Sequence, residues 1–206
     1  MEHQAKAHML EHRDDEAAKL GMWLFIFTEI LLFGGLFLVY AVYRAIYHTQ
    51  FHEASLELNV IFGAVNTIVL LISSMAIAMA LTALQENKVK LSRQLIWLTV
   101  LCAFIFMVNK YFEWGAKFEH DIYPGSELLK KLEHGHILYF GLYFAMTGLH
   151  ALHVTVGMVI LIVVERRIKA GKVHAQKFVF LENAALYWHL VDLIWIFLFP
   201  LLYLIT

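Results

Sequence analysis

Five long apolar runs dominate this sequence, and each is long enough to cross a lipid bilayer. A helix rises ~1.5 Å per residue, so about 20 apolar residues span the ~30 Å hydrocarbon layer. The runs are continuous and do not alternate with polar residues, which favours spanning helices over the strands of a membrane barrel. They cover about residues 20–47, 58–84, 91–115, 136–164 and 183–205.

The composition supports this interpretation. Hydrophobic residues make up 61% of the 206 residues, whereas soluble domains contain ~45–50% apolar residues. We therefore expect an all-α polytopic membrane protein, a bundle of five transmembrane helices in one domain over residues 19–206. Residues 1–18 form a polar tail, which lacks the basic start and apolar core of a signal peptide. The net charge of −1 provides no basic field for nucleic acid.

Basic residues are distributed unevenly between the two sides of the predicted bundle. Eleven lysines and arginines lie on the side of the N-terminus, in the tail and in the turns near residues 88–93 and 166–177. Only five lie on the opposite side or close to it. Because positive charge is retained on the cytoplasmic side, we expect a cytoplasmic N-terminus and a C-terminus outside.

Glu29 is the only acidic or basic side chain within the stretch Leu20–Tyr40. At ~1.5 Å per residue it lies ~15 Å deep, near the middle of the bilayer. A carboxylate at this depth costs on the order of 3 kcal/mol unless it is paired, solvated or protonated. We therefore expect Glu29 to have a partner on another helix or a functional role.

The fourth run carries two histidines, His150 and His153, on one polar face that also includes Tyr143 and Thr147 at ~100° per residue. Three interpretations are open for the histidines. They can hydrogen-bond between helices, bind a metal or haem, or contact protons or lipid headgroups.

The fifth run begins with Glu182, His189 and Asp192 along one stripe, with Trp188 beside Asp192. Ionisable residues within membrane spans are rare and face the bundle interior. In the structural interpretation Glu182 complements the helix dipole, and His189 and Asp192 form structural pairs. In the functional one, they join Glu29 and His150 in a polar cluster in the cytoplasmic half of the membrane, suited to protons, lipid headgroups or a subunit contact.

Other polar residues of the spans are expected to be structural. Asn66 and Ser73 in the second run are typical of hydrogen bonds between membrane helices. Lys110 and Glu113 in the third run are spaced i,i+3, which predicts a local ion pair. Cys102 is the only cysteine, so disulfides and four-thiolate clusters within the chain are excluded.

Five segments of the sequence touch all five runs, in order, and cover nearly the whole chain from about Lys19. They read LGMWLFIFTEILLFGG, VNTIVLLISS, KYFEW, FAMTGLHALHVTVG and LENAALYWHLVDLIWIFLF. In these segments the chain resembles a known family, subunit III of the haem–copper terminal oxidases, in its five-helix bacterial form.

This resemblance implies a non-redox accessory subunit, without catalytic activity of its own, in a complex that reduces O₂ to water and pumps protons in aerobic respiration. It implies a helical bundle beside subunit I, contacts with subunit II and other small subunits, and a location in the bacterial cytoplasmic membrane. Haem and copper are expected in the partner subunits and none in this chain. The expected roles are to stabilise subunit I, to support proton uptake and to bind phospholipid. The residues that match the family's polar positions are Glu29, His150, His153, Glu182, His189 and Asp192.

Four alternatives stay open from the sequence. The chain could be the equivalent subunit of a quinol oxidase or of a nitric oxide reductase. It could be a b-type membrane cytochrome with haem on His150, His153 or His189, although a haem site needs histidines paired across helices. It could also be a small transporter that uses Glu29 as a proton carrier, although broken helices and repeats are missing from the sequence.

Overall fold

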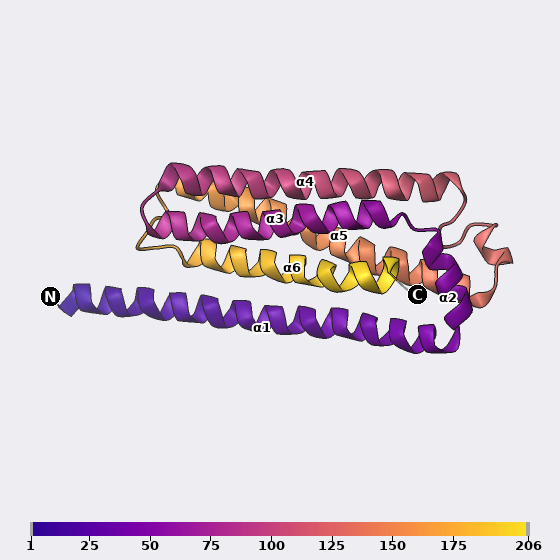
Figure 1. Ribbon diagram of the computed structural model, residues 1–206. Helices are drawn as coiled ribbons and strands as arrows, with labels where there is room; N and C mark the ends of the chain where they lie inside the picture. Colours follow the sequence, from indigo (N-terminus) through magenta and orange to yellow (C-terminus); the bar gives the residue numbers. More distant parts are fainter. Residues whose placement is uncertain (1, 205–206) are drawn as a thin grey trace.

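The computed structural model describes the backbone of residues 2–204 and the side chains of residues 15–129 and 131–204. Over this part of the chain the regular structure is helical, with no strand (Figure 1). The elements are α1 (Glu2–Ile46), α2 (His48–Leu56), α3 (Val60–Gln85), α4 (Val89–Glu119), the 3₁₀ helix η1 (Leu129–Lys131), α5 (His134–Lys169) and α6 (Val179–Tyr203).

Five of these helices are long and apolar enough to cross a membrane, namely α1 from Asp15 onward, α3, α4, α5 and α6. This confirms the predicted all-α membrane fold with five spans. The chain begins α1 at one end of the molecule and finishes α6 at the other (Figure 1). Which end faces the cytoplasm stays a prediction, as does the division into a tail and a membrane domain.

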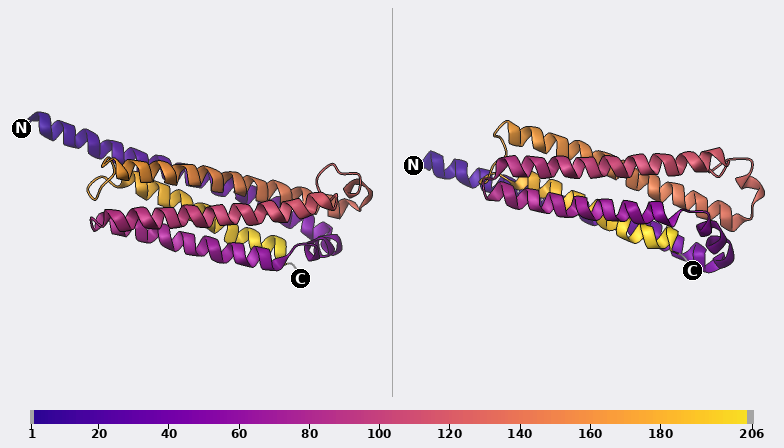
Figure 2. Two further views of the ribbon diagram at one scale, coloured as in Figure 1. Left: turned by 90° about the horizontal axis from the view of Figure 1, so that it is seen from above. Right: turned by 45° about the horizontal axis from the view of Figure 1, so that its top comes forward.

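Helices α3 to α6 pack into a four-helix bundle, and α1 runs along its outside (Figures 1 and 2). Among the described residues, α1 contacts α2, α5 and α6 but makes no contact with α3 or α4. Helix α1 begins at Glu2, so it includes the predicted polar tail. Its first part extends past the bundle (Figures 1 and 2). The side chains of residues 1–14, with the histidines and lysine of the tail, lie outside the described residues.

Three of the long helices end in the same way, with a left-handed residue that reverses the chain. These residues are Asn87 after α3 (φ +60°), Asp121 after α4 (φ +54°) and Gly171 after α5 (φ +69°). In each case the next amide donates to the carbonyl five residues back, as in Lys88 N to Ala83 O at 2.8 Å. This is the Schellman arrangement, and Asn, Asp and Gly are the residues that tolerate it best.

The short helix α2 was not expected, because the sequence places residues 48–57 between two apolar runs. Its nine residues are too few and too polar to produce a membrane signal. Phe51 nevertheless turns inward and is fully buried. Its ring packs against Tyr40 of α1 and Tyr139 of α5, with ring centroids 5.3 and 5.4 Å away. This contact positions α2 across the end of the bundle, which we call the α2 end.

Two tyrosines anchor the final turn of α6 at the α2 end. The Tyr40 hydroxyl donates to the carbonyl oxygen of Leu201, and the Tyr139 hydroxyl donates to that of Leu202, both at 2.6 Å. The last four carbonyls of a helix have no partner within the helix. The two hydroxyls therefore satisfy buried acceptors and tie α6 to α1 and α5.

Candidate functional site in the helix bundle

Glu29 and His153 form an ion pair or hydrogen bond between α1 and α5. The Glu29 carboxylate lies 3.0 Å from His153 Nε2. Only 14% of the Glu29 side chain and 12% of the His153 side chain are exposed. The carboxyl group therefore has a partner on another helix, as its depth in the first run requires.

The other nitrogen of His153 fixes the proton arrangement of this pair. Nδ1 lies 2.7 Å from the carbonyl oxygen of Leu149. Because a carbonyl oxygen only accepts, Nδ1 carries a hydrogen and donates it. One proton then lies between Nε2 and Glu29, either on the carboxyl with a neutral imidazole or on an imidazolium facing a carboxylate. The pair has the same net charge in both states, so the proton can shift without changing the total charge in the membrane.

Aromatic rings surround this pair and hold α1 against the bundle. Phe33 meets the His153 ring edge-on, with centroids 5.5 Å apart. Tyr187 of α6 donates its hydroxyl to the His153 carbonyl oxygen at 3.0 Å and stacks on Phe25 of α1 at 5.8 Å. Side chains of α1, α5 and α6 thus meet at the pair, as the polar faces of the runs predict.

Glu182 lies apart from this pair, at the end of the bundle opposite α2. It is in the first turn of α6, where its charge complements the helix dipole. It also forms an ion pair with Lys19 of α1 at 2.8 Å. This contact links α1 to α6 at the position where the first apolar run begins.

His189 and Asp192 face α3 instead of α1. The Ser74 hydroxyl lies 2.7 Å from His189 Nδ1. Asp192 is 3% exposed, and neither of its carboxyl oxygens has a hydrogen-bond partner of ordinary geometry in the described part of the chain. One turn earlier, Trp188 donates its indole N–H to Ser73 at 3.0 Å. These side chains join α6 to α3 within the bundle.

His150 is fully buried in an aromatic environment, although it shares the polar face of α5. Its ring lies between Phe106 of α4 and Trp195 of α6, with centroids 5.4 and 5.2 Å away. Neither ring nitrogen has a hydrogen-bond partner among the residues that the structure describes. The six candidate residues thus do not form one cluster: Glu29 pairs with His153, Glu182 pairs with Lys19, His189 and Asp192 face α3, and His150 lies among aromatic rings.

The predicted pair of Lys110 and Glu113 is confirmed, with 3.2 Å between Nζ and Oε1. The sequence did not predict its two tyrosine partners. The Tyr143 and Tyr203 hydroxyls both donate to Glu113 Oε1, and Lys110 donates to both tyrosine oxygens at 3.2 and 3.0 Å. We call these four residues the Lys110–Glu113 network. It joins α4, α5 and α6 near the α2 end.

Asn66 and Ser73 of α3 form hydrogen bonds between helices, as expected, and so does Thr67. Asn66 is fully buried and accepts a hydrogen bond from Asn109 of α4 at 2.9 Å. Thr67 accepts one from the indole of Trp195 at 3.1 Å. The Thr67 bond and the bond from Trp188 to Ser73 join α3 to α6 and fix the register of these two helices, whereas the Asn66 bond joins α3 to α4.

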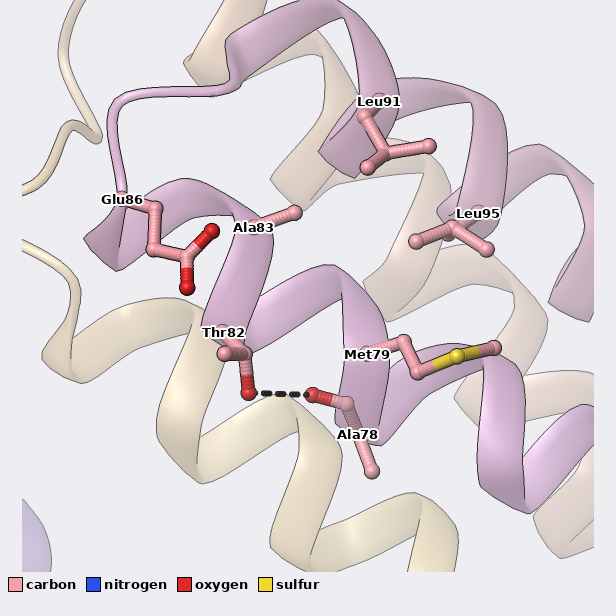
Figure 3. Close-up of a pocket in the computed structure, with 7 residues that line it drawn as sticks. All are labelled: Ala78, Met79, Thr82, Ala83, Glu86, Leu91 and Leu95. Carbon is pink, nitrogen blue, oxygen red and sulfur yellow. Dashed lines mark hydrogen bonds between the residues drawn. The ribbon is translucent and has the colours of Figure 1, made fainter.

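Two apolar grooves open between helices. One of about 200 Å³ lies between α1 and α6 and is lined by Phe33, Gly34 and Phe197 among others. The other, of about 430 Å³, lies between α3 and α4 near their connecting turn, with Glu86 as its charged side chain (Figure 3). The Thr82 hydroxyl in this second groove bonds to the Ala78 carbonyl at 3.3 Å. Both grooves therefore present mainly hydrocarbon.

Within the side chains that the structure describes, no three histidine, cysteine or carboxylate groups lie close enough to hold a metal ion. The nitrogens of His153 are both engaged, and Nδ1 of His189 is bonded to Ser74. The geometry thus favours hydrogen bonding over metal ligation for these two histidines.

Comparison with known proteins agrees with this arrangement. A profile of the family described as cytochrome c oxidase subunit III matches residues 8–206. The cytochrome c oxidase subunit 3 of Thermostichus vulcanus is 32% identical over 97% of this chain and 92% of its own length. That of Corynebacterium diphtheriae is 31% identical over 90% of this chain and 87% of its own. The probable quinol oxidase subunit 3 of Staphylococcus saprophyticus is 29% identical over 100% and 97%.

Three findings lead to one assignment. The family profile matches nearly the whole chain, two of the relatives named above are more than 30% identical to it, and five helices are long enough to span a membrane. This multi-pass membrane protein belongs to the cytochrome c oxidase subunit III family, the subunit III of haem–copper oxidases.

Proposed function

We propose that this chain is a non-redox accessory subunit of a cytochrome c oxidase that supports proton uptake through Glu29 and His153. It contacts subunit I directly, stabilises it, and binds phospholipid between its helices. Haem and copper reside in the partner subunits. The observation that carries the proposal is the 3.0 Å contact of Glu29 with His153, two titratable groups placed between α1 and α5 within the membrane spans.

The chemistry of that pair supports proton handling. Histidine is the side chain whose ordinary titration lies closest to neutral pH, and a carboxyl group beside it shares its proton. The two groups keep a small exposed fraction, so the proton can be exchanged at the surface of α1 and α5. A partner subunit or a file of water at this surface would deliver the proton.

The surface of α1 supports the proposed contacts with subunit I and lipid. Only 11% of the residues in the most apolar 18-residue stretch of α1 are buried within the chain. Large side chains such as Trp23, Phe27 and Leu38 are more than half exposed. In a membrane these residues meet lipid chains or helices of other subunits. The groove between α1 and α6 and the one in Figure 3 have the apolar lining that acyl chains require.

The Glu29→Gln variant tests the role of the pair. Glutamine keeps the size of the side chain, and its amide can still donate to His153 Nε2, but it cannot release a proton. We expect normal assembly and haem content of the purified oxidase. We expect proton uptake by the reconstituted complex, followed with a pH-sensitive dye, to slow severalfold.

The control for this experiment is Thr28→Val. Thr28 is exposed in the same turn of α1, and its hydroxyl donates to the carbonyl oxygen of Phe25 in the same helix. The Thr28→Val variant should leave proton uptake and haem content unchanged. If Glu29→Gln dissociates the complex or lowers its haem content, the pair is structural; if it leaves uptake at the wild-type rate, the pair handles no proton.

A quinol oxidase is the second candidate complex, because relatives named probable quinol oxidase subunit 3 cover nearly all of this chain at 29–30% identity. Rates of O₂ consumption with reduced cytochrome c and with a quinol distinguish the two complexes. The accessory role of this chain is the same in either.

A further inference from the structure

Four charged side chains of alternating sign lead from the surface of the α2 end into the bundle. They are Glu57, Lys117, Glu113 and Lys110. Their exposed fractions fall along this order, at 40%, 11%, 4% and 3%. Lys117 pairs with the Glu57 carboxylate at 3.6 Å and donates to the Glu57 carbonyl oxygen at 2.8 Å. Three of the four lie on one face of α4, because residues three and four apart are neighbours on a helix.

The buried carboxylate of Glu113 is satisfied on one side only. Its Oε1 atom faces three donors, the hydroxyls of Tyr143 and Tyr203 and the ammonium group of Lys110. Its Oε2 atom is buried and has no hydrogen-bond partner among the described residues. An unsatisfied buried acceptor costs about 1–3 kcal/mol, and more when it is charged. Native proteins satisfy such atoms with ordered water when the protein supplies no donor.

The donors around Glu113 show which group can complete the site. Each tyrosine has a single hydroxyl hydrogen, and both are used at Oε1. Lys110 has three ammonium hydrogens and three acceptors, the two tyrosine oxygens and Oε1. Lys117 lies one helical turn from Glu113. It donates one hydrogen to the Glu57 carbonyl oxygen and faces the Glu57 carboxylate at 3.6 Å, which leaves one of its three ammonium hydrogens for a further acceptor.

We propose that an ordered water molecule binds between Glu113 Oε2 and Lys117 Nζ, and that it connects the buried Lys110–Glu113 network to the aqueous phase at the α2 end. The water donates to the carboxylate and accepts from the ammonium group. This site is separate from the Glu29–His153 pair and does not depend on the proposed function.

The other end of the network is closed by aromatic rings. Lys110 lies over the ring of Trp195, with 5.4 Å between Nζ and the ring centroid. Phe106 packs edge-on against Trp195 at 4.8 Å, and both rings contact fully buried His150. These rings separate the Lys110–Glu113 network from the rest of the bundle interior. The proposed water therefore hydrates Glu113 from the α2 end and is not part of a water path through the bundle.

A density map of the intact oxidase complex, at a resolution that shows ordered water, tests this proposal. We expect a peak within hydrogen-bond distance, about 2.7–3.2 Å, of both Glu113 Oε2 and Lys117 Nζ. A map without a peak there, or one in which a protein donor bonds directly to Oε2, would overturn the proposal.

A variant of Lys117 extends the test. Lys117→Met removes the proposed donor of the water but leaves the network itself unchanged. We expect the peak to disappear while Glu113 and both tyrosines keep their positions. Lys131→Met, at an exposed lysine of the same end, should leave the peak in place. A peak that persists in Lys117→Met contradicts the bridge. If the complex with Lys117→Met fails to assemble, the wild-type map tests the proposal by itself, through the presence or absence of the peak.

Discussion

Replacing Lys110 by methionine is expected to destabilise this subunit by about 3–5 kcal/mol. Methionine has a similar length and no charge, so Glu113 would remain buried at 4% exposure without the cation that contacts it. The Tyr143 and Tyr203 hydroxyls can still donate to the carboxylate, but its direct ion pair would be lost. We expect a lower thermal midpoint for retention of this subunit in the detergent-solubilised complex.

Two further variants distinguish the effect of losing this buried charge pair from the effect of losing a lysine on the helix surface. In the double variant Lys110→Met with Glu113→Gln, no uncompensated charge remains, so most of the lost stability should return. Lys88→Met breaks an exposed pair with Glu86, whose side chains are 61% and 53% exposed, and should change stability by less than about 1 kcal/mol. If Lys110→Met is as mild as Lys88→Met, the network does not hold α4, α5 and α6 together.

Gly157→Ala is expected to destabilise the contact between α5 and α6. A Cβ atom at this position would lie 2.8 Å from Trp188 Cε3 and Cζ3 and 3.1 Å from Tyr187 Cε1. Trp188 cannot move away easily, because its ring is fully buried and its N–H is bonded to Ser73. Overpacking of this kind costs about 1–3 kcal/mol. The thermal midpoint of the purified complex should fall.

Gly141→Ala is the matched control on the same helix. Nothing lies within 4 Å of a Cβ atom at Gly141. Because alanine favours a helix over glycine by about 1 kcal/mol, this variant should leave stability unchanged or raise it slightly. A lower thermal midpoint with Gly157→Ala and an unchanged or higher one with Gly141→Ala would show that the close approach of α5 and α6 at Gly157 contributes to stability. Equal effects would contradict the packing described above.

The membrane fold could be predicted from the sequence, because length and hydropathy alone determine that a continuous apolar run spans the bilayer as a helix. The helix ends extend beyond the apolar runs, as α4 does to Glu119 and α5 to Lys169. Polar residues outside the hydrocarbon layer continue a helix until a terminating residue such as Asp121 or Gly171 appears. Helix α2 escaped prediction because Phe51 is its one large buried apolar side chain.

The partners of the candidate residues could be predicted only where they are close in sequence. Lys110 and Glu113 follow from i,i+3 spacing, whereas Tyr143 and Tyr203 lie 30 and 90 residues from Glu113. The depth of Glu29 and the polar face of α5 indicated that they could meet, but rotation of each helix decides which residue faces which. That rotation placed His153 toward Glu29 and turned His189 toward Ser74.

Purification through an affinity tag on this chain tests the central claim, that it is a non-redox subunit of a haem–copper oxidase. We expect the tagged chain to copurify with a haem-containing complex that reduces O₂. After the complex is dissociated, the isolated chain should show no Soret band. Haem that stays with the isolated chain, or a tagged chain that brings down no oxidase, would contradict the account.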